Sequence, residues 1–93
     1  MTGRRLRALV TGAASGIGLG VATHLAERGH LVCLTDLDAD AVEGAAAALR
    51  SRGLEATALR LDVTSAADIE AVSAALEPTG PDLLVNNAGL QHV

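Results

Sequence analysis

Three glycines that follow a short apolar segment constrain this chain more than any other feature. Gly12, Gly16 and Gly18 come directly after Leu6–Val10, which has the apolar composition of a buried strand, and a helical pattern over Gly16–Arg28 begins among them. Glycine lacks a Cβ, so these positions permit a tight turn out of a strand and a helix packed closely on a sheet. The spacing predicts a strand, a tight loop and a helix, as in an α/β fold.

The same loop predicts a site for a dinucleotide. Gly16 lets the backbone approach a pyrophosphate, and the first free N–H groups of the following helix point at the phosphates with the positive end of the helix dipole behind them. The alternative is a flexible turn of glycine and alanine between any strand and helix. The residues at the other strand ends, described below, weigh against that alternative.

Strand-like and helix-like apolar patterns alternate along the rest of the chain. The predicted strands are Leu6–Val10, Leu31–Thr35, Ala56–Leu61 and Leu83–Val85. The second helix is capped by Asp38 or Asp40 and runs to about Arg52. A capping box at Ser65–Asp68 begins the third helix, and the segment Pro78–Pro81 stops it.

Each predicted helix has one apolar face. The first presents Ile17, Val21 and Leu25, the second Val42, Ala45, Ala46 and Leu49, and the third Ile69, Val72, Ala75 and Leu76. Gly29 and Gly53 stand where C-cap glycines end the first two helices.

The order β-α-β-α-β-α-β predicts one open parallel sheet of Rossmann type. Right-handed crossovers give the strand order 3-2-1-4. The topological switch point then lies between the first and fourth strands, where ligands bind in such sheets. Thr11–Gly18 and Asn86–Gly89 both emerge at that point.

Composition limits the chain to one globular domain and excludes several classes of partner. The 93 residues carry a net charge of −4 and contain no aromatic residue, so nucleic acid is not an expected partner. No apolar run approaches the length that spans a membrane, so a membrane is not expected either. The basic cluster of Arg4, Arg5 and Arg7 reads as solvated charges beside the first strand. The single cysteine, Cys33, excludes internal disulfides and fits a reducing compartment, so we expect the cytoplasm. Cys33 is expected in the core.

Several polar residues are candidates for a ligand site. Asp36 ends the second strand, where a carboxylate can accept hydrogen bonds from ribose hydroxyls and repel a 2′-phosphate. Since no arginine or lysine lies in residues 13–15 or just after Asp36, we expect NAD rather than NADP. The alternative is a loop aspartate that helps start the next helix. His24 and His30 have no partner at metal-ligand spacing and are expected on the surface, so no metal site is predicted.

The pattern Thr11-Gly12-x-x-x-Gly16-x-Gly18, together with Asn86-Asn87-Ala88-Gly89, resembles the short-chain dehydrogenase/reductase family. The resemblance covers the whole chain but only the first part of that family's fold. It implies an NAD-dependent oxidoreductase in which the pair Asp62–Val63 holds the adenine ring. The positions it implies for NAD are Gly12, Ser15, Gly16, Ile17, Gly18, Asp36, Leu37, Asp62, Val63, Asn87, Ala88 and Gly89.

Residues 86–93 are more narrowly similar to the 3-hydroxybutyrate dehydrogenases. In those enzymes the glutamine that matches Gln91 helps bind the substrate carboxylate. The alternative is that Gln91 and His92 belong to a solvated chain end.

The chain contains no tyrosine and no lysine, whereas the family uses a serine, a tyrosine and a lysine in catalysis. We therefore expect an NAD-binding N-terminal portion, truncated before the catalytic half and inactive alone. A non-catalytic nucleotide-binding module and a fragment that binds nothing remain alternatives. The complete enzyme is expected to form a homo-oligomer and to act on a small molecule. The fragment is expected to self-associate through its fourth strand.

Overall fold

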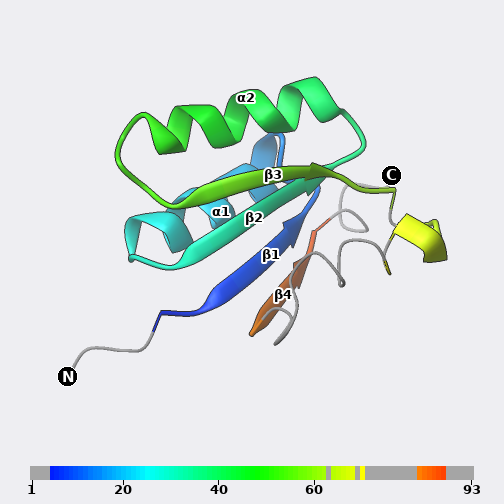
Figure 1. Ribbon diagram of the computed structural model, residues 1–93, viewed down its shortest axis with the longest axis horizontal. Coiled ribbons are helices and arrows are strands. Elements are labelled where there is room, and N and C mark those ends of the chain that lie inside the picture. Colours follow the sequence, from blue (N-terminus) through cyan, green and yellow to red (C-terminus); the bar gives the residue numbers. More distant parts are fainter. Residues whose placement is uncertain (1–4, 63, 69, 71–81, 88–93) are drawn as a thin grey trace.

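The computed structural model describes residues 5–62, 64–68, 70 and 82–87 and contains one four-stranded parallel sheet (Figure 1). The strands are β1 (Arg7–Thr11), β2 (Leu31–Asp36), β3 (Ala56–Arg60) and β4 (Leu83–Asn86). Their order is β3-β2-β1-β4, so the predicted sheet is confirmed. The predicted strand ends differ from the observed ones by one residue at most.

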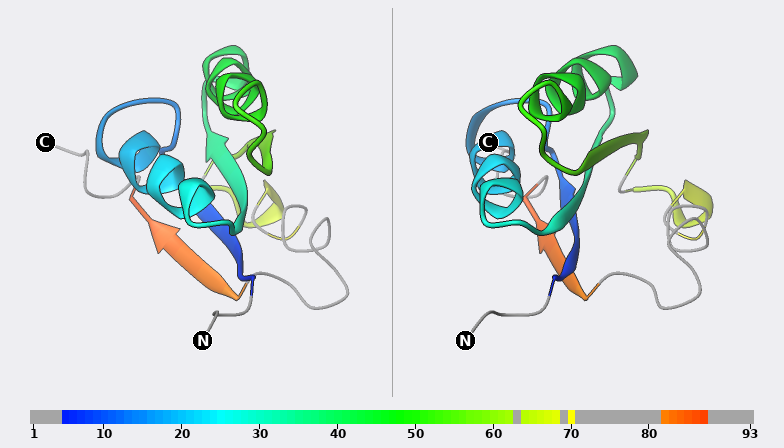
Figure 2. Two further views of the ribbon diagram at one scale, coloured as in Figure 1. Left: turned by 90° about the vertical axis from the view of Figure 1, so that its left-hand side faces the viewer. Right: turned by 60° about the vertical axis from the view of Figure 1, so that its left-hand side comes forward.

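Two helices cover one face of the sheet. They are α1 (Gly16–Glu27) and α2 (Ala39–Arg50), and their apolar residues share one core cluster with the inward side chains of the strands. Val10 and Leu34, both fully buried, belong to this cluster. On the other face, Leu9, Cys33 and Leu61 form a smaller cluster. Figure 2 shows α1 and the helical turn at residues 66–68 on opposite sides of the sheet.

The predicted buried face of α1 is wrong by one residue. Gly18, Ala22 and Ala26 are buried, while Ile17 is 68% exposed. A Cβ at Gly18 would lie 2.1 Å from the Gly12 carbonyl oxygen. The helix therefore lies so close to the loop and the sheet that only small side chains fit beneath it.

The predicted buried face of α2 is confirmed, but the helix ends at Arg50, two residues before the predicted end at Arg52. Asp38 rather than Asp40 caps the helix, since the Ala41 N–H donates to Asp38 Oδ1 at 3.0 Å. Val42, Ala46 and Leu49 are buried, and Ala45 packs against them. The helix is followed by Gly53, whose φ of +83° lies in the left-handed region that favours glycine.

Only the beginning of the third predicted helix lies within the described residues. Residues 66–68 are helical, and the Asp68 N–H donates to Ser65 Oγ at 3.1 Å, as a cap at Ser65 requires. The reciprocal half of the predicted box is not formed, because the Asp68 carboxylate accepts hydrogen bonds from the end of β3 instead. The predicted face of this helix, Ile69, Val72, Ala75 and Leu76, and the stop at 78–81 lie outside the described residues.

Three further predictions concern single side chains. Cys33 is buried in the core as predicted, and burial raises the pKa of its thiol. His24 is exposed as predicted, but His30 is half-buried and its Nδ1 accepts the Leu6 N–H at 3.1 Å. His30 is thus a packing and hydrogen-bonding residue at the start of β2 rather than a surface one. No helix among the described residues has the length and apolar character needed to cross a membrane.

Candidate functional site

The polar residues that follow the strands gather at one edge of the sheet. All four strands run parallel, so their carboxyl ends meet there. Thr11 at the end of β1 is in register with Asn86 at the end of β4, and its hydroxyl donates to Asn86 Oδ1 at 3.0 Å. The end of β2 contributes Asp36, and the segment after β3 contributes Asp62. This edge therefore contains the strand ends at which the sequence predicts a site.

The glycine-rich loop between β1 and α1 is held at defined positions. Gly12 and Gly16 have φ values of +62° and +61°, which strain any residue with a Cβ. The Ala13 N–H donates to the Thr35 carbonyl at 2.9 Å. A Cβ at Gly16 would have no atom within 4 Å, so the loop faces open space at that residue. This open, fixed backbone is what the approach of a phosphate requires.

Asp36 connects the glycine-rich loop to β2. Its Oδ2 accepts the Ala14 N–H at 3.0 Å and its Oδ1 accepts the Asp38 N–H at 3.2 Å. Each carboxylate oxygen has a second lone pair that these backbone bonds do not use. Asp36 thus orders the loop and still presents acceptors at the edge of the sheet.

The N-terminus of α1 is suited to a negatively charged ligand. Ser15 occupies the N-cap position but its side chain makes no capping hydrogen bond, and the first turn contains no acidic residue. The backbone N–H groups of a first turn have no partner within the helix, and the helix dipole places positive potential there. Neither a cap nor a carboxylate in that turn offsets the attraction for an anion.

Gly18 and Asn87 bring β4 against the loop. The buried Asn87 side chain donates from Nδ2 to the Gly12 carbonyl at 3.2 Å, and a Cβ on Gly18 would lie 2.7 Å from that nitrogen. The Asn87 Oδ1 is buried and has no hydrogen-bond partner among the described residues. A buried acceptor without a donor is costly. The site therefore contains one acceptor that a donor from elsewhere would satisfy.

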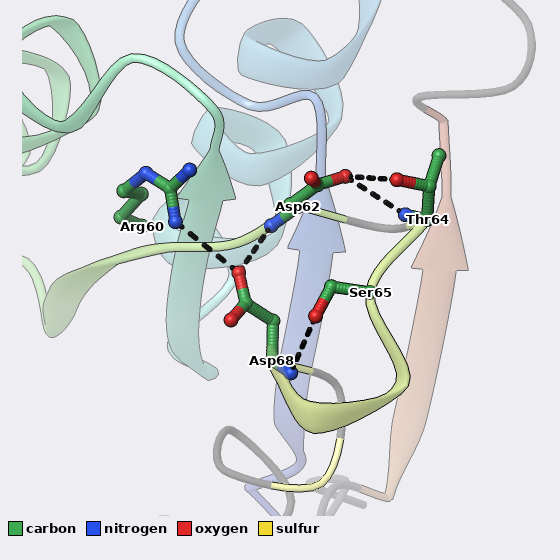
Figure 3. Close-up of polar contacts among 5 residues, drawn as sticks. All are labelled: Arg60, Asp62, Thr64, Ser65 and Asp68. Carbon is green, nitrogen blue, oxygen red and sulfur yellow. Dashed lines mark hydrogen bonds and ion pairs between the residues drawn. The ribbon is translucent and has the colours of Figure 1, made fainter.

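Asp62 lies in a polar cluster after β3 (Figure 3). Its Oδ1 accepts the Thr64 hydroxyl at 2.6 Å and the Thr64 N–H at 2.9 Å. These two bonds stabilise the charged form and lower the pKa of the Asp62 carboxyl, and the guanidinium of Arg60 adds to the effect. Asp68 accepts the Asp62 N–H at 3.0 Å and pairs with Arg60 at 3.2 Å. Asp62 is thus held as a carboxylate by fixed neighbours.

The short chain dehydrogenase family matches residues 7–93 of this chain. The chain belongs to that family.

Individual relatives agree with the assignment. An uncharacterized oxidoreductase, YxjF, of Bacillus subtilis (strain 168) is 45% identical over 97% of the chain and 36% of its own length. The D-beta-hydroxybutyrate dehydrogenase of Cupriavidus necator is 44% identical over 92% of the chain and 34% of its own length. The crystal structure of a hydroxysteroid dehydrogenase from Escherichia coli superimposes with a TM-score of 0.80 at 34% identity, over 88% of this chain and 37% of that one. The chain spans about a third of the length of these relatives.

The structure places most of the predicted site residues at one edge. Gly12, Gly18 and Asn87 contact one another, Asp36 binds the same loop at Ala14, and Gly16 faces open space there. Ser15, Ile17 and Leu37 lie exposed at the same edge, and Leu37 is 60% exposed. Val63, Ala88, Gly89 and Gln91 lie outside the described residues.

Sequence reasoning missed three residues that support the site. Thr35 is fully buried, and its hydroxyl donates to the Val10 carbonyl at 3.0 Å. Arg60 and Asp68 hold the segment after β3. A threonine in an apolar strand and an aspartate in a helix turn carry no signal of these roles, because their partners lie far away in the chain or on another element.

The described residues contain no group of three or more histidine, cysteine or carboxylate side chains that could hold a metal ion. A hollow of about 80 Å³ lies at the opposite edge, between the first residues of β2 and β3, and is lined by Leu31, Cys33, Glu55 and Thr57 among others. The hollow is far smaller than the roughly 300 to 1,000 Å³ of ligand pockets. It is not a candidate for a dinucleotide.

Proposed function

We propose that this chain binds NAD at the carboxyl edge of the sheet. It would form part of an oxidoreductase that transfers hydride between NAD and a small hydroxy compound. The observation that carries the proposal is the open loop at Gly16, next to the uncapped N-terminus of α1 and the Asp36 carboxylate. The loop and helix suit the pyrophosphate, and the carboxylate suits the ribose hydroxyls.

Two carboxylates among the described residues support the choice of NAD. Asp36 keeps one lone pair on each oxygen for a ribose hydroxyl, and its charge opposes a 2′-phosphate. The ionised Asp62 would accept a hydrogen bond from the adenine. We propose the same twelve positions that the family resemblance implies, Val63, Ala88 and Gly89 among them.

The proposed hydride transfer also needs an acid/base group, which this chain does not supply. NAD supplies the hydride acceptor, but the chain has no tyrosine or lysine to serve as the acid/base pair, so we expect the 93-residue chain alone to be inactive. We propose 3-hydroxybutyrate as a substrate, with Gln91 binding its carboxylate, from the similarity of residues 86–93 and one relative at 44% identity. We also propose that the complete enzyme is a cytoplasmic homo-oligomer. We propose no nucleic-acid or membrane partner for it.

Binding of NAD and NADP to the full-length protein, measured by calorimetry, tests the proposal. We expect NAD to bind more tightly than NADP, and Gly16→Val to weaken NAD binding at least about tenfold, since a side chain there enters the path of the pyrophosphate. Gly53→Val is the matched control, because Gly53 also has a positive φ and open space at its Cβ but lies at the far end of α2. Equal losses in both variants, or equal affinities for the two dinucleotides, would overturn the proposal.

A further inference from the structure

We infer that the ion pair between Arg60 and Asp68 sets how strongly this site discriminates between NAD and NADP. The inference rests on the proposed dinucleotide site and identifies two further specificity residues for it. The Asp36 carboxylate repels the 2′-phosphate of NADP. A cation close to Asp36 would offset this negative charge and weaken the repulsion.

Arg60 is that cation. It is the last residue of β3 and the register partner of Asp36 on β2, and the next residue, Leu61, donates its N–H to the Asp36 carbonyl at 2.9 Å. Neighbouring strands lie about 4.8 Å apart, so a guanidinium at this position can reach the surroundings of the Asp36 carboxylate. No arginine or lysine lies next to the glycine loop or just after Asp36 in the sequence, whereas Arg60 comes to Asp36 from the neighbouring strand β3.

No other arginine of the described residues shares this location. Arg5 and Arg7 lie at the beginning of β1, at the opposite edge of the sheet. Arg28, Arg50 and Arg52 follow or close the two helices, which run back to that opposite edge. A 2′-phosphate near Asp36 would therefore have Arg60 as its candidate cation within this part of the chain.

Asp68 competes for that cation. The Arg60 guanidinium lies 3.2 Å from Asp68 Oδ2, and the same oxygen accepts the Asp62 N–H at 3.0 Å (Figure 3). The backbone of Asp68 is fixed in turn by its hydrogen bond to Ser65 Oγ. Asp68 is thus a fixed acceptor that holds the guanidinium, while Asp36 accepts only backbone N–H groups among the described residues.

Removal of the Asp68 charge should release Arg60 toward a 2′-phosphate. Asp68→Asn is the sharpest variant, because an amide oxygen can still accept the Asp62 N–H and the side chain keeps its size. Both side chains are partly exposed, at 54% for Arg60 and 32% for Asp68, so the pair is screened by solvent and salt. We therefore expect a modest effect, largest at low ionic strength.

The experiment measures the dissociation constants of NAD and NADP for the full-length protein by calorimetry at low and high salt. In Asp68→Asn, NADP binding should tighten about two- to fivefold relative to NAD binding. In Arg60→Gln, NADP binding should weaken relative to NAD, and the double variant should lose the gain seen in Asp68→Asn. Glu27→Gln is the matched control: it removes one charge from an exposed ion pair with Arg52, away from the site, and should leave the ratio unchanged.

An unchanged ratio in Asp68→Asn and Arg60→Gln, with NAD still bound, would overturn the inference and leave the proposed function intact. A gain that persists in the double variant would also overturn it, because the gain would then not come from Arg60. Failure of the unmodified protein to bind either dinucleotide would overturn the proposed function and the inference together.

Discussion

The strands β2 and β4 have similar apolar sequences but very different surroundings. In β2, Val32, Cys33, Leu34 and Thr35 are all buried, whereas Leu83 and Leu84 of β4 are 36% and 60% exposed. The difference lies in position: β2 runs between β1 and β3 beneath both helices, and among the described residues β4 pairs with β1 alone. Apolar composition identifies a strand, but its neighbours decide how much of it is buried.

At their carboxyl ends the two strands show the reverse difference in burial. β2 ends in the half-buried Asp36, whose carboxylate accepts two backbone N–H groups. The exposed β4 is followed by Asn87, which is 1% exposed and bound to the Gly12 carbonyl. The strand β4 is therefore anchored to the glycine loop at its carboxyl end, although Leu83 and Leu84 are exposed.

The largest expected effect tests the difference in burial between β2 and β4. Leu34→Ala removes a fully buried side chain from β2 and should lower the free energy of unfolding by about 2 to 5 kcal/mol. Leu84→Ala makes the same chemical change in β4 and should lower it by less than about 0.5 kcal/mol, since the side chain is already mostly exposed. Urea unfolding of the 93-residue chain measures both. Equal losses would show that β4 is as well packed as β2.

The second prediction tests the anchor of β4. In Gly18→Ala the new methyl group would collide with the Gly12 carbonyl and the Asn87 amide, so stability should fall by about 1 to 3 kcal/mol. Gly44→Ala, on the open side of α2, should instead raise it by about 0.5 to 1 kcal/mol. Thermal unfolding compares the two variants. A neutral Gly18→Ala would mean that the loop and β4 move apart at little cost.

The third prediction concerns the open edge itself. Among the described residues β4 has no strand on its outer side, and an uncharged open edge is a template for pairing with another chain, so we expect the 93-residue chain to self-associate. Leu84→Lys places a charge on β4 and should shift the chain toward monomer. Sedimentation velocity over a tenfold concentration range is the measurement. An unmodified chain that stays monomeric throughout would contradict the prediction.

The smallest effect is a pH dependence at the end of β3. Because Thr64 lowers the pKa of Asp62 below its ordinary value of 3.8, this group stabilises the folded chain above that pH and stops doing so as the pH falls through the lowered value. Thr64→Val removes the hydroxyl donor but keeps the N–H, so the pKa should move part of the way back; Thr64→Ser should leave it in place. NMR titration of the Asp62 carboxyl carbon measures the pKa. An identical pKa in Thr64→Val would show that the hydroxyl bond contributes nothing.

The sequence by itself determined the order of strands and helices and most of the glycine loop. Apolar periods of two and 3.6 residues, the cap at Asp38 and the glycines at 12 and 16 act through neighbours a few residues away. Right-handed crossovers then leave one strand order. Local chemistry was therefore enough to predict that the loop, Asp36 and Asn87 would meet at one edge.

Tertiary structure decided which side chains face which partners. The burial of Ala22 instead of Val21 depends on how closely α1 lies over Gly12. Arg60 stands beside Asp36 only because β3 pairs with β2 in one register, across 24 residues of chain. Such contacts depend on distances between elements, which a local pattern does not contain.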